Sequence, residues 1–243
     1  MVASLENTIA FVTGAGRGLG LALVEELIQK GCKKVYAGVR SQSHVDRLLD
    51  LDTEHLIPLQ LDITQENDII RAVNVAGDCN LLINNAGIYA DGILLDASMD
   101  ELRQLIEVNY FGTLNMIRHF VPGLKRNANS AIVNILSISA LANVPAIGGY
   151  SASKAAAQSL TQSFRQLLAN QNIRVHGVYP GPIDTDMTGG LSVPKANVGE
   201  VAVSILDGLI NGDEDIFPDK MSRQGGQAWR SDPKVLERQL ALG

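Results

Sequence analysis

The sequence has few cysteines and no basic stretch, and each shortage removes a class of protein. The two cysteines, Cys32 and Cys79, belong to no CxxC pair or metal-ligand cluster. We therefore expect free thiols in a reducing compartment, with no disulfide and no metal site. The net charge is -6, and no run of Lys or Arg forms a stripe, so a nucleic-acid partner is not expected.

A membrane span and a secretory leader are missing as well. No apolar stretch approaches the ~20 residues that cross a bilayer. Residues 1–7 are short and mixed, without a basic region or a cleavage site. These absences predict a cytoplasmic protein that has no membrane partner.

The composition is that of a soluble protein with a substantial core. Of the 243 residues, 46% are hydrophobic and 19% are charged, and no Pro/Gly-rich linker divides the chain. We expect one domain, residues 1–243, that both binds a dinucleotide and carries the catalytic groups. Within it, residues 186–243 would supply a substrate loop and a polar C-terminal segment of unassigned structure.

Short apolar runs alternate with amphipathic stretches along the chain. The runs are almost continuously hydrophobic, which indicates strands buried on both faces, and the stretches between them have helical periodicity. This alternation predicts an α/β protein, a doubly wound parallel sheet in a single Rossmann-fold domain. The expected strands are residues 8–13, 34–39, 56–61, 81–84, 131–137, 174–179 and, at an edge, 215–217; the expected helices are 18–30, 65–76, 100–124, 150–169 and 197–210.

A glycine-rich turn follows the first expected strand and opens a helix. Its sequence runs from Thr13 to Gly20 as TGAGRGLG. Glycines at Gly14, Gly18 and Gly20 would let the backbone approach a pyrophosphate, which a helix N-terminus stabilises. A glycine cluster can also be an ordinary loop, but the strand before it and the helix after it favour a dinucleotide site.

The second expected strand ends at Arg40 without the carboxylate that usually binds the adenosine ribose of NAD. Arg40, together with Arg17 in the glycine turn, could pair instead with a 2′-phosphate. The alternative is that both arginines are solvated surface residues. Their positions favour NADP(H) over NAD(H).

Tyr150 and Lys154 stand four residues apart on an expected helix, so both side chains can point into one cleft. The Lys154 charge would lower the pKa of the Tyr150 phenol from ~10 and let it exchange protons near neutrality. The alternative is a solvated pair on an exposed helix. Together with the glycine turn, the pattern indicates an acid-base site beside a coenzyme.

These motifs together resemble the short-chain dehydrogenase/reductase family, and the likeness runs over residues 8–187. The chain looks similar to NADP(H)-preferring carbonyl reductases of that family. The matching features are the glycine turn, Leu61-Asp62-Ile63, Asn84-Asn85-Ala86-Gly87, Asn109, Ser137, Tyr150 with Lys154, and the run from Pro180 to Thr185.

The resemblance implies catalytic roles for four residues. Tyr150 would donate a proton to the carbonyl oxygen, and Lys154 would lower the pKa of Tyr150 and hold the nicotinamide ribose. Ser137 would hydrogen-bond the substrate oxygen, and Asn109 would position Lys154 and a water molecule. Ser137, with Ser139 as a weaker claimant, could instead satisfy backbone groups at a strand end, and Asn109 could bind a neighbouring loop.

The resemblance also implies cofactor contacts along the chain. Asp62 and the Ile63 amide would contact adenine, and Ile183 with Thr185 would bind the carboxamide. Residues 84–87 could otherwise form a simple turn. The complete set of expected cofactor residues is Gly14, Arg17, Gly18, Leu19, Gly20, Arg40, Asp62, Ile63, Asn85, Ala86, Gly87, Tyr150, Lys154, Pro180, Ile183 and Thr185.

Substrate and partners are less closely defined. The loops at residues 88–95, 141–149 and 187–194 are mostly apolar or neutral. This pattern suits a small or medium, uncharged carbonyl or alcohol substrate, and ordinary loop packing would explain it equally well. The resemblance implies a homodimer through the helices expected at 100–124 and 150–169, and it leaves a homotetramer open. The alternative functions are a nucleotide-sensing protein without catalysis and a purely structural protein. The presence of all four catalytic residues argues against a sensor, and the enzyme is favoured over both alternatives.

Overall fold

The computed structural model describes residues 4–51, 54–127 and 129–241. Its strands form one parallel seven-stranded sheet in the order β3-β2-β1-β4-β5-β6-β7. The predicted α/β fold class is confirmed. The strands are β1 Ile9–Thr13, β2 Lys34–Val39, β3 Leu56–Gln60, β4 Leu81–Asn84, β5 Ser130–Ile135, β6 Ile173–Val178 and β7 Asp215–Ile216.

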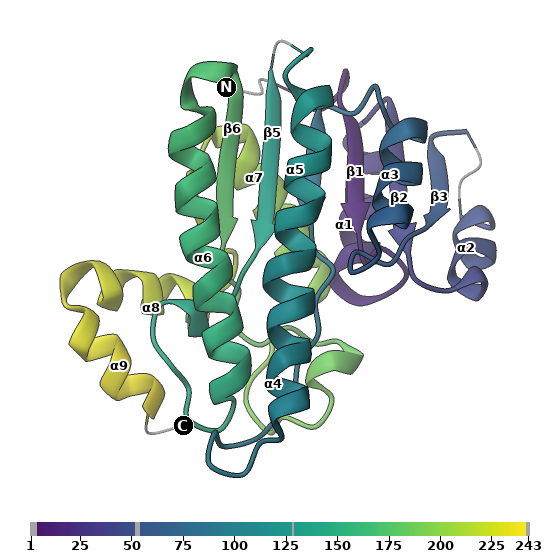
Figure 1. Cartoon of the computed structure of the whole chain (residues 1–243). Coiled ribbons are helices and arrows are strands. Elements are labelled where there is room, and N and C mark those ends of the chain that lie inside the picture. The colour runs from purple at the N-terminus through teal and green to yellow at the C-terminus, as the bar shows by residue number, and fades with distance from the viewer. Residues whose placement is uncertain (1–3, 52–53, 128, 242–243) are drawn as a thin grey trace.

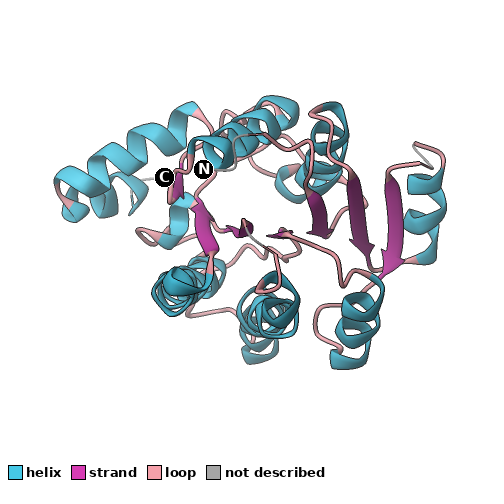
Figure 2. Ribbon diagram, turned by 90° about the horizontal axis from the view of Figure 1, so that it is seen from above, coloured by secondary structure: helices cyan, strands magenta, loops and turns pink. Residues whose placement is uncertain are grey.

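Helices cover both faces of this sheet (Figures 1 and 2). One apolar core joins the strands to α1 and α7, and a second joins them to α3, α5 and α6. Burial on both faces explains the almost uninterrupted hydrophobicity of the strands. The helices are α1 Gly18–Gln29, α2 Gln42–Leu49, α3 Glu66–Val75, α4 Met99–Ile106, α5 Thr113–Leu124, α6 Gly148–Leu168, α7 Val198–Asn211, α8 Lys220–Ser231 and α9 Pro233–Ala241.

The helix expected at residues 100–124 is interrupted in the structure. A π-helical segment, Glu107–Gly112, separates α4 from α5. The start of α4 is well defined, since Ser98 and Glu101 form a capping box there. The apolar pattern on either side of the segment is helical, and a single wide turn has no residue pattern of its own, so the sequence did not reveal it.

The sequence also failed to predict three helices. Helix α2 is one of them, and α8 and α9 form the C-terminal segment that was left unassigned. Asp219 begins α8 with a capping box, and Pro233 occupies the first position of α9, so local signals were present in a polar stretch. Among the described residues, no helix has the length and apolar character needed to cross a membrane.

Candidate active site

The glycine turn between β1 and α1 is packed tightly against the end of β4. Gly14 and Gly18 have φ angles of +67° and +54°, which glycine adopts without strain. A Cβ atom on Gly20 would lie 2.2 Å from the Gly14 oxygen, and one on Gly14 would lie 2.8 Å from the Ala86 Cα. Leu19 is buried in the first turn of α1. At Gly14 and Gly20 the turn therefore has no room for a side chain, and it presents main-chain atoms at a helix N-terminus, where a pyrophosphate fits.

Thr13 fastens this turn to the loop after β4. Its Oγ1 accepts hydrogen bonds from the amides of Asn85 at 3.0 Å and Ala86 at 2.9 Å. In return, the Asn85 side chain donates to the main-chain oxygens of Thr13 and Gly14. Two sets of predicted cofactor residues, 14–20 and 85–87, therefore meet at the carboxyl ends of β1 and β4. We did not predict the clamping role of Thr13, although a hydroxyl residue ending a buried strand could have indicated it.

Two further predicted residues follow β2 and β3. Arg40 is exposed and has no ion pair with any residue that the structure describes. The Asp62 carboxylate accepts hydrogen bonds from the amide and the hydroxyl of Thr64, at 2.9 and 2.7 Å. Ile63 is buried against Gly112, where an added Cβ would lie 2.7 Å from its Cδ1. Ile63 can therefore offer a ligand its main chain, while Arg40 keeps a free guanidinium.

Residues 183–188 lie beside the glycine turn. A Cβ on Gly18 would lie 3.2 Å from the Thr185 methyl group, and Arg17 Nη1 lies 3.1 Å from Asp186 Oδ2. Ile183 forms an isolated parallel bridge with residue 196. Thr185 thus stands next to the predicted phosphate turn, and Ile183 lies two residues before it. Pairing of Arg17 with Asp186 was not foreseen, because 169 positions separate them.

Tyr150 and Lys154 stand on one face at the start of α6, as predicted, with the Lys154 Nζ 5.7 Å from the centre of the Tyr150 ring. Nζ donates a hydrogen bond to the main-chain oxygen of Ile135 at 2.9 Å. Desolvation lowers the pKa of Lys154 to about 8 and raises the pKa of Tyr150 to about 12. Our expectation that Lys154 lowers the Tyr150 pKa is wrong for this structure, because burial is the largest influence on that pKa and raises it.

Ser137 lies just after β5, which ends two residues earlier than predicted. Its Oγ accepts hydrogen bonds from the amide and the hydroxyl of Ser139, at 3.2 and 3.0 Å. A side-chain hydrogen bond with Ser137 lowers the pKa of Tyr150 and offsets part of the effect of burial. The Pro180 oxygen accepts from the Ile138 amide at 2.9 Å. Ser139 thus holds the Ser137 hydroxyl in place through two hydrogen bonds.

Asn109 occupies the π-helical segment, and its side chain is held at both ends. Its Oδ1 accepts from the Ile88 amide at 2.9 Å, while its Nδ2 donates to the Ile88 oxygen at 3.0 Å and to Ser153 Oγ at 2.9 Å. A Cβ on Gly87 would lie 3.0 Å from Asn109 Oδ1 and 3.5 Å from Lys154 Nζ. Asn109 and Lys154 therefore meet at Gly87 without a direct hydrogen bond. Ser153 was missed, although it lies inside the Tyr150 motif.

Tyr89 is a second aromatic residue at the site that the sequence did not single out. Its ring packs edge-on against Tyr150, with ring centres 5.1 Å apart, and its hydroxyl donates to the Asp91 carboxylate. Gly92 joins the segment that precedes α6 through a parallel bridge to Ile147. These contacts place Tyr89 and the loop that follows it beside Tyr150 and the start of α6.

The loops that we expect to contact substrate expose several apolar side chains. Leu94 lies against α6, where a Cβ on Gly148 would be 2.7 Å from its Cγ. In the loops at residues 88–95 and 187–194, the exposed apolar residues are Ile93, Leu94, Leu95, Met187 and Val193.

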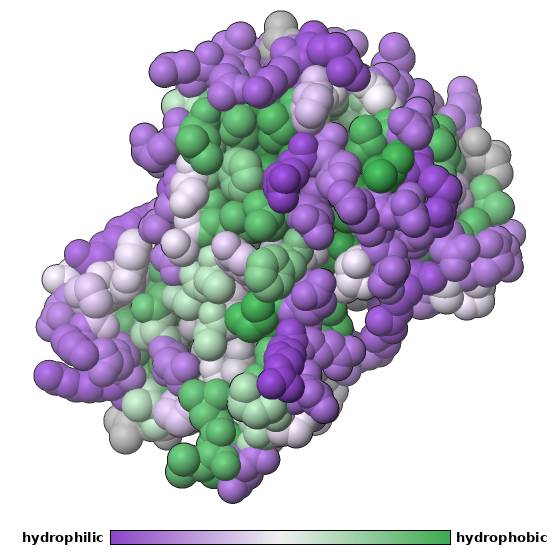
Figure 3. Space-filling view, viewed as in Figure 1, coloured by the Kyte–Doolittle hydropathy of each residue, from purple (hydrophilic) through white to green (hydrophobic). Residues whose placement is uncertain are grey.

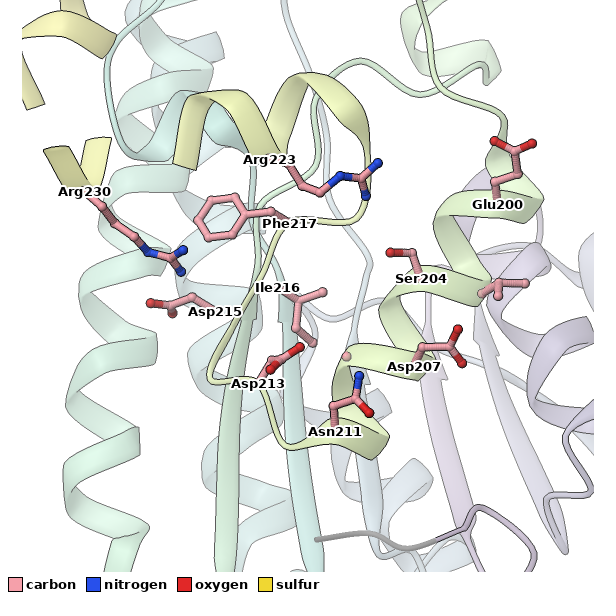
Figure 4. A pocket seen from close by; sticks show the side chains of 12 residues that line it. Glu200, Ser204, Asp207, Asn211, Asp213, Asp215, Ile216, Phe217, Arg223 and Arg230 are labelled. Carbon is pink, nitrogen blue, oxygen red and sulfur yellow. The ribbon is translucent and has the colours of Figure 1, made fainter. Parts of the chain in front are cut away.

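A separate cavity of about 650 Å³ lies between α7, β7 and α8 (Figure 4). Arg223 and Arg230 of α8 face it from one side, and Glu200 and Asp207 of α7 face it from the other. None of the predicted site residues lines this cavity. It is therefore distinct from the candidate active site at the carboxyl ends of the strands.

Comparisons with known proteins give one consistent family. The model of the short chain dehydrogenase family matches residues 8–195. An uncharacterised oxidoreductase of Staphylococcus aureus is 32% identical, over 84% of this chain and 92% of that protein. A 3-alpha-(or 20-beta)-hydroxysteroid dehydrogenase of Mycobacterium bovis is 33% identical, over 77% of this chain and 74% of that protein.

Solved structures agree with these matches. A short chain dehydrogenase from Burkholderia cenocepacia J2315 in complex with NADP is 41% identical, covers 98% of each chain and has a TM-score of 0.90. A short-chain dehydrogenase from Sphingobium yanoikuyae in complex with NADPH is 25% identical, covers 93% of this chain and 95% of that chain, and has a TM-score of 0.78.

Proposed function

Because the chain belongs to the short-chain dehydrogenase family, it is an oxidoreductase that acts on alcohol or carbonyl substrates with a nicotinamide cofactor, and we propose that it is an NADP(H)-dependent carbonyl reductase. The observation that carries the proposal is the convergence of Ser137, Tyr150, Lys154 and Asn109 beside the glycine turn. The chain would work as one dinucleotide-binding and catalytic domain.

Tyr150 is the proton donor in this proposal. Its pKa of about 12 keeps the phenol protonated at neutral pH, which suits donation to a carbonyl oxygen during reduction. Ser137 would hold that oxygen through its hydroxyl proton, because its Oγ already accepts from Ser139. The nicotinamide, when bound, supplies or accepts the hydride.

Lys154 and Asn109 would bind the coenzyme and position the neighbouring loop without taking part in proton transfer themselves. Lys154 keeps donors beyond the one it gives to Ile135, and these could bind ribose hydroxyls. With a pKa of about 8, Lys154 is still mostly charged at neutral pH and would donate to those hydroxyls as an ammonium group. Asn109 keeps the Ile88 loop in place, so the cleft retains its shape beside Lys154.

The preference for NADP(H) rests on two arginines. Arg40 carries a free guanidinium at the end of β2, where a carboxylate would favour NAD. Arg17 lies in the adjacent glycine turn. The Burkholderia cenocepacia protein, 41% identical, was solved in complex with NADP, which supports the same preference here.

The substrate is proposed to be uncharged and largely apolar. The Tyr89 and Tyr150 rings form an aromatic wall, and the loops at residues 93–95 and 187–193 expose apolar side chains. Such a cleft favours aldehydes, ketones or secondary alcohols with apolar substituents. The hydroxysteroid dehydrogenase named among the relatives is consistent with this class.

A homodimer is proposed through the helices around α5 and α6. Apolar residues cover α6 and its border with α5 in Figure 3, and Phe111 and Leu167 are exposed there. Burial of such a patch would stabilise association. A homotetramer stays a second proposal.

Purified protein tests the reaction directly. We expect NADPH oxidation with a panel of apolar ketones and aldehydes, and slower oxidation of NADH. Tyr150→Phe should reduce kcat by about 10²- to 10⁴-fold, the range for loss of a general acid, while coenzyme still raises its melting temperature. Coenzyme binding without turnover in the unmutated protein would instead favour a nucleotide sensor.

A further inference from the structure

The guanidinium of Arg17 already has a partner within the protein. Its Nη1 lies 3.1 Å from Asp186 Oδ2, and the two side chains are 64% and 75% exposed. Arg17 belongs to the glycine turn, and Asp186 begins the short 3-10 turn Asp186–Thr188. No other side-chain hydrogen bond or ion pair of Arg17 is found within the described residues. The pair therefore links the glycine turn directly to the segment of residues 183–188.

The neighbouring backbone keeps these two side chains within reach of each other. Thr185 packs on Gly18, which fixes the residue before Asp186 beside the residue after Arg17. Asp184 in turn is anchored by its amide, which donates to the oxygen of residue 196 at 2.9 Å. The backbone of both segments is held, while the Arg17 and Asp186 side chains are free to turn in solvent. A change of partner by Arg17 therefore needs only side-chain rotation.

We propose that Asp186 competes with the coenzyme 2′-phosphate for Arg17 and thereby limits the preference of the protein for NADP(H) over NAD(H). The inference rests on the proposed NADP(H) function, in which Arg17 binds that phosphate. A guanidinium that pairs with a phosphate through two parallel hydrogen bonds must release a carboxylate held by the same nitrogens. NAD(H) carries a hydroxyl at this position, so it leaves the Arg17–Asp186 pair intact. Asp186 is thus a positioning residue for coenzyme selectivity that acts through Arg17.

The expected effect is modest, because exposed ion pairs contribute little net free energy and are screened by salt. Removing the Asp186 charge should tighten binding of a 2′-phosphorylated ligand by about two- to fivefold. The gain should shrink as the salt concentration rises. A ligand without the 2′-phosphate should gain almost nothing.

Binding of two coenzyme fragments tests this without any turnover. Isothermal titration of adenosine 2′,5′-bisphosphate and of AMP would be compared for the unmutated protein and for Asp186→Asn. We expect the variant to bind the bisphosphate two- to fivefold more tightly and AMP equally well. Asp184→Asn is the matched control, because it removes an exposed carboxylate from the same segment that forms no ion pair with Arg17. It should leave the ratio of the two dissociation constants unchanged.

A double-mutant cycle shows whether the effect of Asp186→Asn depends on Arg17. In an Arg17→Ala background, Asp186→Asn should no longer change the ratio of the two dissociation constants. An equal effect of Asp184→Asn, or an Asp186→Asn effect that persists without Arg17, would overturn the inference. If the unmutated protein favours the bisphosphate over AMP but Asp186→Asn is silent, only this inference fails. If the protein shows no preference for the bisphosphate, the proposed NADP(H) specificity fails with it.

Discussion

Lys154 donates its hydrogen bond to the main-chain oxygen of Ile135, 2.9 Å away, and not to Asn109. The lysine is buried, and its charge is held against the end of the central strand β5. Asn109 is occupied by Ile88 and Ser153 instead. The two residues are thus positioned independently, and substitutions should separate their effects.

Replacement of Lys154 should stabilise the protein while abolishing its activity. Burial lowers the pKa of Lys154 from 10.5 to about 8, so the charged form disfavours folding at pH 7. Lys154→Met should raise the free energy of unfolding at pH 7 by about 2 to 3 kcal/mol. The unfolded chain holds the extra proton between pH 8 and 10.5, so the unmutated protein should recover this difference as the pH rises through that window.

Urea unfolding at pH 7 and pH 10 measures this effect. The exposed Lys125 provides a control, and Lys125→Met should change stability little at either pH. A Lys154→Met protein that is less stable than the unmutated one at pH 7 would contradict the prediction.

Ser153→Ala should impair catalysis through Asn109. Ser153 is fully buried, accepts a hydrogen bond from Asn109 Nδ2 and donates one to the main-chain oxygen of Tyr150. Its loss leaves a buried amide donor unpaired, at about 1 to 3 kcal/mol of stability. We expect a lower kcat with coenzyme affinity retained, measured by steady-state kinetics and fluorescence titration. Ser151→Ala, equally buried but without a bond to Asn109, should leave kcat closer to that of the unmutated enzyme.

Gly20→Ala should prevent coenzyme binding. The new Cβ would lie 2.2 Å from the Gly14 oxygen, so the phosphate turn would have to move. Gly77→Ala is the control, since its Cβ would meet nothing closer than 3.6 Å. We expect coenzyme to raise the melting temperature of Gly77→Ala but not of Gly20→Ala. Equal protection of both variants would show that the turn is not the phosphate site.

Arg40→Asp should reverse the coenzyme preference. An acidic residue at this position suits the ribose hydroxyls of NAD(H) and repels a 2′-phosphate. We expect kcat/KM for NADPH to fall at least tenfold relative to that for NADH. If the unmutated enzyme used both coenzymes with equal kcat/KM, the basis of this prediction would be lost.

The sequence predicted those parts of the protein whose physical cause is local. Residues 81–83 of the buried strand β4 are continuously apolar, and the glycines of the turn are required by close backbone contacts. The placement of Tyr150 and Lys154 on one face follows from helical spacing alone.

What the sequence could not reveal depends on distant partners. Arg17 meets Asp186 across 169 positions, and Asn109 meets Ser153 across 44. The pKa of Tyr150 was wrongly predicted because burial by the folded chain, and not the neighbouring lysine, is its largest determinant. Helix α2 was missed because it is short, with one fully buried residue, Leu48.

The π-helical segment Glu107–Gly112 has a consequence for how this protein tolerates changes in length. The wide turn takes in one additional residue, so α4 and α5 keep nearly the angular relation that they would have in a continuous α-helix. Deleting a single residue there should let an ordinary helix run through while both flanking helices keep their packing. Only side chains inside the turn would be displaced, among them the carboxamide of Asn109 that bonds to Ile88, so such a deletion should cost activity more than stability.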